Sequence, residues 1–175
     1  MPAPITQQQL LLDLEPVVEG ELNRHIPVAK EWFPHEYIPW SEGRTFDGVL
    51  GGEPWSEDQS PMSDVARSAL IVNLLTEDNL PSYHHEVAVL FGREAAWGDW
   101  VHRWTAEEGR HGTAIRDYLL VKRAVDPVEL ERARMTHMSQ GYQSAHTADL
   151  INSLAYVSFQ ELATRVSHRN TGKAT

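Results

Sequence analysis

Apolar side chains recur every three to four positions along most of this chain, the spacing that lines one face of an α-helix. The first such segment covers residues 7–30 and is lightly interrupted at Pro16. Ser63-Asp64 and Asp126-Pro127 are typical helix starts. The pattern predicts helices over about residues 7–30, 65–90, 94–121, 127–138 and 148–172, with Gly172 suited to a C-terminal cap. It therefore predicts an all-α protein.

Residues 31–62 break the helical pattern. They are rich in Trp, Pro and Gly and include Trp32, Trp40 and Trp55. Loops of this length in compact domains are usually functional coverings or disordered. Three tryptophans favour a packed loop, so we expect one helical domain over residues 1–175 with a long ordered loop at 31–62.

Glu108 and His111 stand three residues apart on the apolar face of the helix predicted over 94–121. Residues at this spacing lie about one turn apart on the same side of a helix, so both can reach one point. A carboxylate and an imidazole are ligands for first-row metals, and Glu-x-x-His is the repeated unit of carboxylate-bridged di-metal helix bundles. Such a bundle needs two units, and residues 113–175 contain no other.

Two further carboxylates, Glu77 and Glu161, also fall on otherwise apolar helix faces. A buried ionised carboxylate is costly unless it is paired or binds a metal. One buried glutamate is more often a salt-bridged core residue, but three on three helices, with His111 at ligand spacing from Glu108, favour a metal site. Pro81 lies four residues after Glu77 and cannot donate a hydrogen bond to its carbonyl, which predicts a local helix distortion there.

The remaining polar candidates have ordinary explanations. His84 lies seven residues after Glu77, on nearly the same face, and is the rival ligand by geometry, although a surface or supporting role is favoured. Thr164 is expected to be a core threonine that hydrogen-bonds its own helix backbone, and Glu107 to be solvated or ion-paired. The other histidines are expected to be structural or exposed: His25, His35, His102, His137, His146 and His168.

Composition narrows the chemistry. The chain has 175 residues, of which 41% are hydrophobic, and this fits one packed globular domain. It has no cysteine, so a metal would be held by oxygen and nitrogen ligands, which points to iron, manganese or zinc. The sequence shows neither a membrane-spanning apolar run nor a signal-peptide pattern, so we expect a cytoplasmic protein. The net charge of -10 disfavours nucleic acid as a partner.

Several segments around these residues resemble the soluble acyl-ACP desaturases (the stearoyl-ACP desaturase family), and most closely their actinobacterial branch. The matching segments are Leu14–Glu19, Trp32–Tyr37, Thr76–Tyr83, Trp104–Gly112, Ser158–Thr164 and Ser167–Thr171. The resemblance spans nearly all of the chain. It implies a ferritin-like helix bundle that holds two irons, usually in a homodimer. The activity it implies is the insertion of a cis double bond into an acyl chain on acyl carrier protein in fatty acid biosynthesis, with O2 and with electrons from ferredoxin.

Site residues follow from the resemblance position by position. It implies that Glu77, Glu108 and His111 serve one iron, with Glu108 bridging to a second. Glu161 would serve that second iron. Thr164 matches the family threonine placed to assist O2 activation near the irons, a role beyond that of a core threonine.

The resemblance also covers the surroundings of the site. Trp32 and His111 match two members of the family's proposed electron route from the surface. Trp104 lies one turn from Glu108 and is expected to wall the site. Gly109 departs from the family's usual asparagine, which costs about 1 kcal/mol of helix propensity but leaves the ligand spacing unchanged.

A larger departure is length. Family members are much longer than this chain, and their second Glu-x-x-His lies beyond the part that these residues match. We therefore interpret the sequence as the N-terminal half of an acyl-ACP desaturase, and we expect the chain alone to be inactive because ligands of the second iron are missing. One alternative is another di-iron bundle oxidase, such as a ribonucleotide reductase small subunit or ferritin, but the segment Phe159–Thr164 speaks against both. The other is a non-catalytic or complementing fragment that pairs with another desaturase chain.

Acyl carrier protein is acidic, so an acidic protein must meet it with a local basic patch. The candidates are Arg116, Lys122, Arg123, Arg132 and Arg134. A solvated helix face explains these residues equally well.

Overall fold

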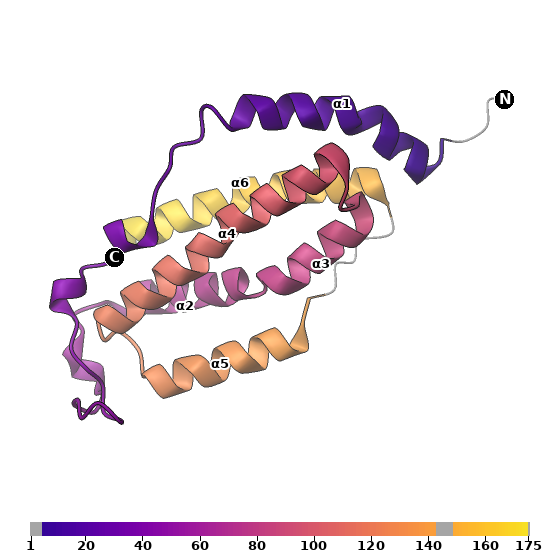
Figure 1. Ribbon diagram of the computed structural model, residues 1–175. Coiled ribbons are helices and arrows are strands. Elements are labelled where there is room, and N and C mark those ends of the chain that lie inside the picture. Colours follow the sequence, from indigo (N-terminus) through magenta and orange to yellow (C-terminus); the bar gives the residue numbers. More distant parts are fainter. Residues whose placement is uncertain (1–4, 143–148, 175) are drawn as a thin grey trace.

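The computed structural model describes residues 5–142 and 149–174, and these residues form helices without a named strand. The α-helices are α1 Gln7–His25, α2 Asp64–Asp78, α3 Leu80–Phe91, α4 Ala95–Val121, α5 Pro127–Gln140 and α6 Leu150–Ala174. In Figure 1, α2 and α3 follow one another end to end below α4, while α1 and α5 lie at opposite edges. The predicted all-α class is confirmed. Within the described ranges, none of these helices is long and apolar enough to cross a bilayer.

The helix predicted over residues 65–90 is divided in two. α2 ends at Asp78, and α3 starts two residues later at Leu80. Pro81 lies in the first turn of α3, where its missing N–H needs no intrahelical partner. The distortion predicted beside Glu77 is therefore confirmed, and it is a complete break between two helices.

Two apolar clusters flank the middle of α4. The cluster near its N-terminal end buries Val87, Ala88, Phe91, Trp97, Val101 and Leu150. The cluster near its C-terminal end buries Leu74, Leu119, Ala124, Val125 and Leu130. Because a fully buried large apolar side chain contributes about 1.5–3 kcal/mol, these clusters fix α4 against its neighbours. Glu108 and His111 lie on the turns of α4 between them.

The long loop between α1 and α2 packs onto the helices through a buried arginine. It contains short 3₁₀ turns at Pro34–Glu36, Trp40–Glu42 and Glu57–Gln59. The side chain of Arg123 is 1% exposed and donates to the carbonyl oxygens of Glu53 and Pro54 at 3.1 and 2.9 Å. Its guanidinium also lies 4.1 Å from the centroid of the Phe46 ring. Arg123 therefore organises the loop from within.

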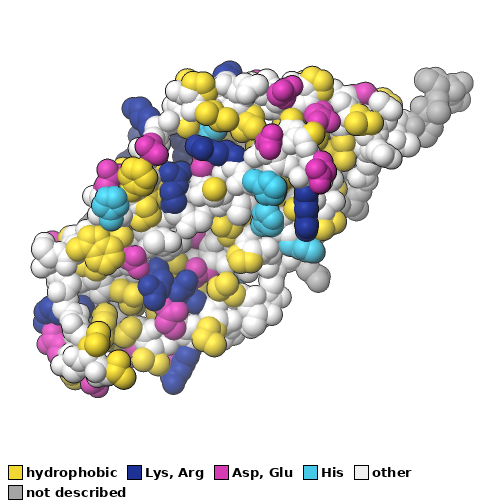
Figure 2. Space-filling view, in the orientation of Figure 1, with side chains coloured by type: hydrophobic (Ala, Val, Ile, Leu, Met, Phe, Trp, Pro, Cys, Tyr) yellow, Lys and Arg dark blue, Asp and Glu magenta, His cyan; other side chains and the backbone are white. Residues whose placement is uncertain are grey.

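The basic side chains considered as a docking patch are engaged with other groups. Four form the ion pairs Arg116–Glu131, Lys122–Glu42, Arg132–Glu129 and Arg134–Asp78. The fifth, Arg123, is buried. On the face shown in Figure 2, basic and acidic side chains are interspersed rather than separated by sign. These residues therefore do not form a single basic patch: four are ion-paired, and Arg123 is buried rather than part of a solvated face.

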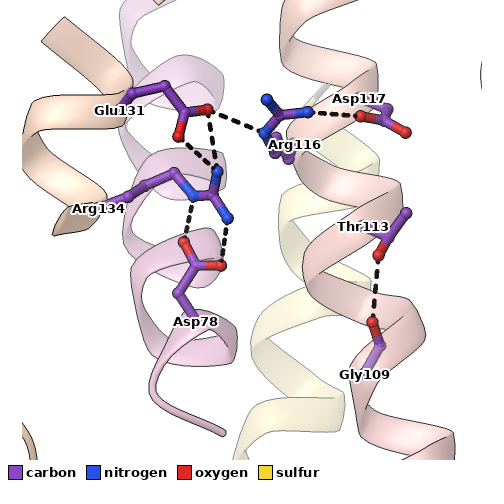
Figure 3. A network of polar contacts seen from close by, with 7 residues as sticks. All are labelled: Asp78, Gly109, Thr113, Arg116, Asp117, Glu131 and Arg134. Carbon is purple, nitrogen blue, oxygen red and sulfur yellow. Dashed lines mark hydrogen bonds and ion pairs between the residues drawn. The ribbon is translucent and has the colours of Figure 1, made fainter. Parts of the chain in front are cut away.

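Figure 3 shows how α5 is held against α2 and α4. The Arg134 guanidinium donates to both carboxylate oxygens of Asp78, from Nε at 2.6 Å and from Nη2 at 2.9 Å. Glu131 accepts hydrogen bonds from Arg134 and from Arg116 of α4, each at 2.9 Å. Asp78 is the last residue of α2, so this network holds the end of the helix that carries Glu77.

The last turn of α6 corrects one expectation. Gly172 was expected to cap the helix, but α6 continues to Ala174 and Gly172 lies inside it. Thr171 is buried, and its Oγ1 accepts a hydrogen bond from Asn73 Nδ2 of α2 at 3.1 Å. This tertiary contact holds the final turn of α6 against α2, so the residue type at position 172 does not decide where the helix ends.

The middle of α6 has little cover. Every residue from 158 to 163 is exposed. Phe159, Leu162 and Val166 are 71%, 56% and 50% exposed, and they share one side of the helix. Glu161, expected on a buried stripe, is exposed as a residue, although its carboxyl group turns towards Trp104 and accepts a hydrogen bond from it.

Candidate metal centre

The last turn of α2 and the middle of α4 bring three ligand-type side chains together. One donor atom from each of Glu77, Glu108 and His111 lies within 4.8 Å of the others. His111 Nδ1 is 3.0 Å from Glu108 Oε2 and 3.5 Å from Glu77 Oε2. The side chains of Glu77 and Glu108 are only 9% and 19% exposed. Among the described residues, this is the one group of three or more such side chains placed to hold a metal ion.

The hydrogen bonds of this cluster shift the pKa values of its members in opposite directions. Hydrogen bonds to Glu108 and then to Glu77 raise the pKa of His111 to about 10, although burial opposes the shift. Burial also opposes ionisation of Glu77, but its hydrogen bonds with His111 and His168 prevail and lower its pKa. An imidazolium is therefore held between two carboxylates, in the position that a cation would be expected to take.

Glu161 of α6 joins these carboxylates at the wall of the same hollow. Trp104 Nε1 donates a hydrogen bond to Glu161 Oε1 at 3.1 Å, so Trp104 walls the site and orients this carboxylate. Desolvation of the carboxyl group raises the pKa of Glu161, and the charges of Glu108 and Glu77 raise it further. The residue is exposed on the open side of α6, yet its carboxyl group faces like charges, which favours a cation between them.

His168 is a site residue that sequence reasoning missed. It was expected to be structural or exposed, but its Nε2 lies 2.9 Å from Glu77 Oε1. Its ring centroid is 6.1 Å from that of His111. His168 follows Glu161 by seven residues, or about two helical turns, so both fall on one face of α6. That spacing is the signal that could have identified it.

Thr164 and Trp32 both reach the site. Thr164 Oγ1 lies 3.1 Å from the carbonyl oxygens of Gln160 and Glu161, so it bonds its own helix as the spacing predicted. It also lines the hollow beside the carboxylates. The indole of Trp32 lies parallel to the imidazole of His111, with ring centroids 5.7 Å apart and planes 7° apart.

An apolar cavity opens next to the carboxylates, between α3, α4 and α6. Its apolar and aromatic lining includes Tyr83, Val87, Leu90, Phe91, Trp104, Tyr142, Tyr156 and Val157. Glu77, Glu108 and Glu161 form part of the same wall. The hydroxyls of Tyr142 and Tyr156 are 2.9 Å apart, and this hydrogen bond, with burial, raises the pKa of Tyr156 to about 12. Tyr156 is therefore neutral at ordinary pH, and the apolar lining suits an apolar ligand.

The competing histidines lie elsewhere. His84, the rival ligand, places its Nδ1 2.7 Å from Thr105 Oγ1 and its ring 6.3 Å from that of His102. His25 pairs with Glu107 at 3.1 Å. His137 Nε2 lies 2.6 Å from Asn79 Nδ2, and His35 stacks on Phe33. His146 lies outside the described residues. None of the five described histidines among these joins the carboxylate cluster.

The donor set fits iron in type and arrangement. Three carboxylates and an imidazole are hard and borderline ligands suited to a first-row divalent metal, and the three closest donors converge from two helices. The hydrogen bonding points the same way, because His111 Nδ1 lies near a carboxylate oxygen of both Glu108 and Glu77, so the three donors face one point. Among the described residues, His111 is the histidine that joins Glu77 and Glu108 in this group, which offers one ligand atom from each of three side chains.

Comparison with known proteins now places the chain. A family model described as fatty acid desaturase matches residues 6–175. DesA1 of Mycobacterium tuberculosis (strain ATCC 25618 / H37Rv), which carries the name of an acyl-[acyl-carrier-protein] desaturase, is 58% identical over 99% of this chain and 53% of its own length. The chain belongs to the fatty acid desaturase family. The alternatives of a ribonucleotide reductase small subunit or ferritin are thereby set aside.

More distant relatives agree with this assignment. Stearoyl-[acyl-carrier-protein] 9-desaturase 2 of Arabidopsis thaliana is 30% identical over 97% of this chain and 43% of its own length. The X-ray structure of the acyl-ACP desaturase DesA2 from Mycobacterium tuberculosis H37Rv matches with 35% identity and a TM-score of 0.55, over 79% of this chain and 48% of that one. The ferritin-like helical fold is confirmed. The chain spans about half the length of the curated relatives it matches.

Proposed function

We propose that this chain supplies half of the catalytic centre of an acyl-ACP desaturase. The reaction would introduce a double bond into an acyl chain carried on acyl carrier protein, as the names of the relatives describe. The observation that carries the proposal is the convergence of Glu77, Glu108 and His111 beside an apolar cavity. A metal site next to an apolar slot is what oxidation of a hydrocarbon chain requires.

The proposed ligand roles are those that the family resemblance implies, and the convergence of Glu77, Glu108 and His111 supports them. Glu77, Glu108 and His111 would hold one iron, with Glu108 shared with a second iron that Glu161 serves. When bound, the irons would supply the oxidising power from O2 that side chains alone lack for an unactivated methylene. Trp104 orients Glu161 through its N–H, and His168 orients Glu77. Such supporting hydrogen bonds fix ligand geometry and typically affect metal affinity 10–100-fold.

The residues around the proposed metal site would bind the acyl chain and carry electrons to the metal. The apolar cavity would exclude water and align the acyl chain with the carboxylate cluster. Thr164 lies at the wall of that cavity, where its hydroxyl can exchange its backbone hydrogen bond for one to a reacting oxygen. The parallel stack of Trp32 on His111 supports a route for electrons from a ferredoxin. We further propose a cytoplasmic homodimer as the state of the whole enzyme.

The isolated chain is not expected to desaturate. The second iron would have Glu161 and a share of Glu108. His168 lines the same hollow, but it is hydrogen-bonded to Glu77 and does not join the ligand group of the described residues. Full-length relatives have about as much sequence again outside the matched part. Turnover would therefore need ligands from that additional sequence.

A second candidate function, a complementing fragment, rests on α6. Its middle exposes Phe159, Leu162 and Val166 on one side, next to the carboxylate of the incomplete site. Apolar helix faces of this kind are normally buried against another helix. A polypeptide that corresponds to the other half of a desaturase would cover this face and bring the missing ligands to Glu161.

Anaerobic titration of the metal-free chain with Fe(II) tests the site. We expect about one iron per chain, lost in His111→Ala and retained in His85→Ala, an exposed histidine of α3 that is outside the cluster. Iron binding that is the same in both variants would refute the ligand assignment.

Turnover separates the two candidate functions. The chain would be assayed with acyl-ACP, ferredoxin, a reductant and O2, alone and after mixing with the C-terminal half of DesA1. Product from the mixture only, with two irons per complex, would support complementation. Product from the chain alone would show that the second iron needs no further ligand, which contradicts the reasoning above.

A further inference from the structure

Trp32 contacts the side chains of two neighbouring residues of α4. Its indole lies parallel to His111, and the guanidinium carbon of Arg110 lies 4.7 Å from the ring centroid. Arg110 is anchored there because its Nη1 donates to the Trp32 carbonyl oxygen at 3.0 Å. A guanidinium over an indole face is attracted by the electron density of the ring. The position of this charge is therefore fixed by the backbone of the residue it covers.

The charge on Arg110 is not cancelled locally. Across the described residues, no carboxylate pairs with its guanidinium, whereas Arg103, two turns earlier on α4, pairs with Glu107. The other hydrogen bond of Arg110 goes to the Glu107 carbonyl oxygen, at 3.3 Å, and this contact carries no opposing charge. The positive charge of the Arg110 guanidinium therefore acts on the Trp32 indole without a paired carboxylate to offset it.

We propose that Arg110 keeps Trp32 reduced by raising the free energy of its one-electron oxidised form. Oxidation removes one electron from the indole and leaves a radical cation, which then loses the N–H proton to water. A fixed positive charge nearby disfavours that cation. With screening as in water, a unit charge 4.7 Å away changes such an equilibrium about fourfold, and weaker screening enlarges the change.

The position of Trp32 suggests why its oxidation would need to be suppressed. The ring is the aromatic group in contact with His111, beside a site that we propose to oxidise hydrocarbons with O2. Tyr37, 64% exposed, meets the edge of Trp32 with ring centroids 5.7 Å apart, so a lost electron could be replaced only from near the surface. The protective role of Arg110 rests on the proposed function. The effect of its charge on the oxidation of Trp32 does not, so the experiment can refute one without refuting the other.

The test oxidises the metal-free chain with tris(bipyridine)ruthenium(III), generated by light and persulfate, and maps oxidised tryptophan by peptide mass spectrometry. Arg110→Gln removes the charge but keeps an N–H for the Trp32 carbonyl, whereas Arg110→Lys keeps the charge. We expect oxidation at Trp32 to rise at least about threefold in Arg110→Gln and to stay near the wild-type value in Arg110→Lys. His111 is unchanged in both variants, so it contributes equally to Trp32 oxidation in the wild type, Arg110→Gln and Arg110→Lys.

Two controls make the result decisive. Arg103→Gln removes a neighbouring charge that does not face the ring, and it should leave Trp32 oxidation unchanged. The neutral azidyl radical should reproduce the order of the variants, because repulsion of a cationic oxidant plays no part with it. An equal rise in Arg110→Gln and Arg110→Lys would overturn the proposal in favour of simple anchoring. A rise seen only with the ruthenium oxidant, or an equal rise in Arg103→Gln, would overturn it in favour of surface charge.

Discussion

Removing the guanidinium of Arg134 tests how strongly α5 holds the part of the bundle that carries Glu77. In Arg134→Met, the Asp78 carboxylate, 8% exposed, loses both N–H donors. An uncompensated buried charge costs about 3–5 kcal/mol. Because the Arg134 side chain is itself 18% exposed, water would reach the carboxylate, and we expect the free energy of unfolding to fall by about 2–3 kcal/mol. The more exposed contact with Glu131 adds little, since such pairs contribute about 0–1 kcal/mol.

The matched control lies on the same helix. Arg132 pairs with Glu129, and their side chains are 70% and 65% exposed, so Arg132→Met should cost less than about 0.5 kcal/mol. Urea unfolding followed by far-UV circular dichroism gives the free energies. Adding Asp78→Asn to Arg134→Met removes the stranded charge and should recover about 1 kcal/mol or more. A cost below about 1 kcal/mol for Arg134→Met, or no recovery in the double variant, would refute the reasoning.

Three further outcomes are expected. The pKa of Tyr156, raised to about 12, means that its hydrogen bond stabilises the fold fully below pH 10 and loses this effect as the pH rises towards 12. Phenolate absorbance should show this late ionisation, and Tyr142→Phe should move it to lower pH; an unmoved titration would contradict the assignment. His168→Ala should weaken Fe(II) binding about 10–100-fold, while His85→Ala leaves it unchanged, and equal affinities would exclude a supporting role. Fe(II) at about 100 times its Kd should stabilise the chain by about 2.7 kcal/mol in urea, and Glu108→Gln should remove this gain.

The parts of the site that sequence reasoning could predict lie within one helix or beside a proline. The offset of Glu108 and His111 follows from the helical repeat alone, so their contact at 3.0 Å needs no knowledge of the tertiary structure. The break after Glu77 follows from the missing N–H of Pro81. That Glu77 meets the other two residues was suggested by its place on an apolar face, which implied burial next to another helix.

The parts that escaped prediction depend on contacts between distant segments. His168 binds Glu77 across 91 positions of sequence, and no local pattern records such a contact. Arg123 was grouped with surface charges, yet it is buried because loop carbonyls solvate its guanidinium in place of water. Gly172 continues a helix because the buried Thr171 is bonded to α2. In each case a tertiary hydrogen bond outweighs the ordinary preference of the residue type.

Charge counting supports the proposal that one Glu-x-x-His unit supplies half of a two-iron centre. Glu77, Glu108 and Glu161 carry three negative charges when ionised, and a protonated His111 returns one, so an excess of two remains. The raised pKa of Glu161 reflects that excess, since the charges of Glu108 and Glu77 oppose its ionisation. One divalent iron with a neutral His111 leaves a single negative charge, whereas two would leave a single positive charge. A fourth carboxylate balances two ferrous ions, so electroneutrality, like the exposed side of α6, points to a further acidic ligand beside Glu161 from outside this chain.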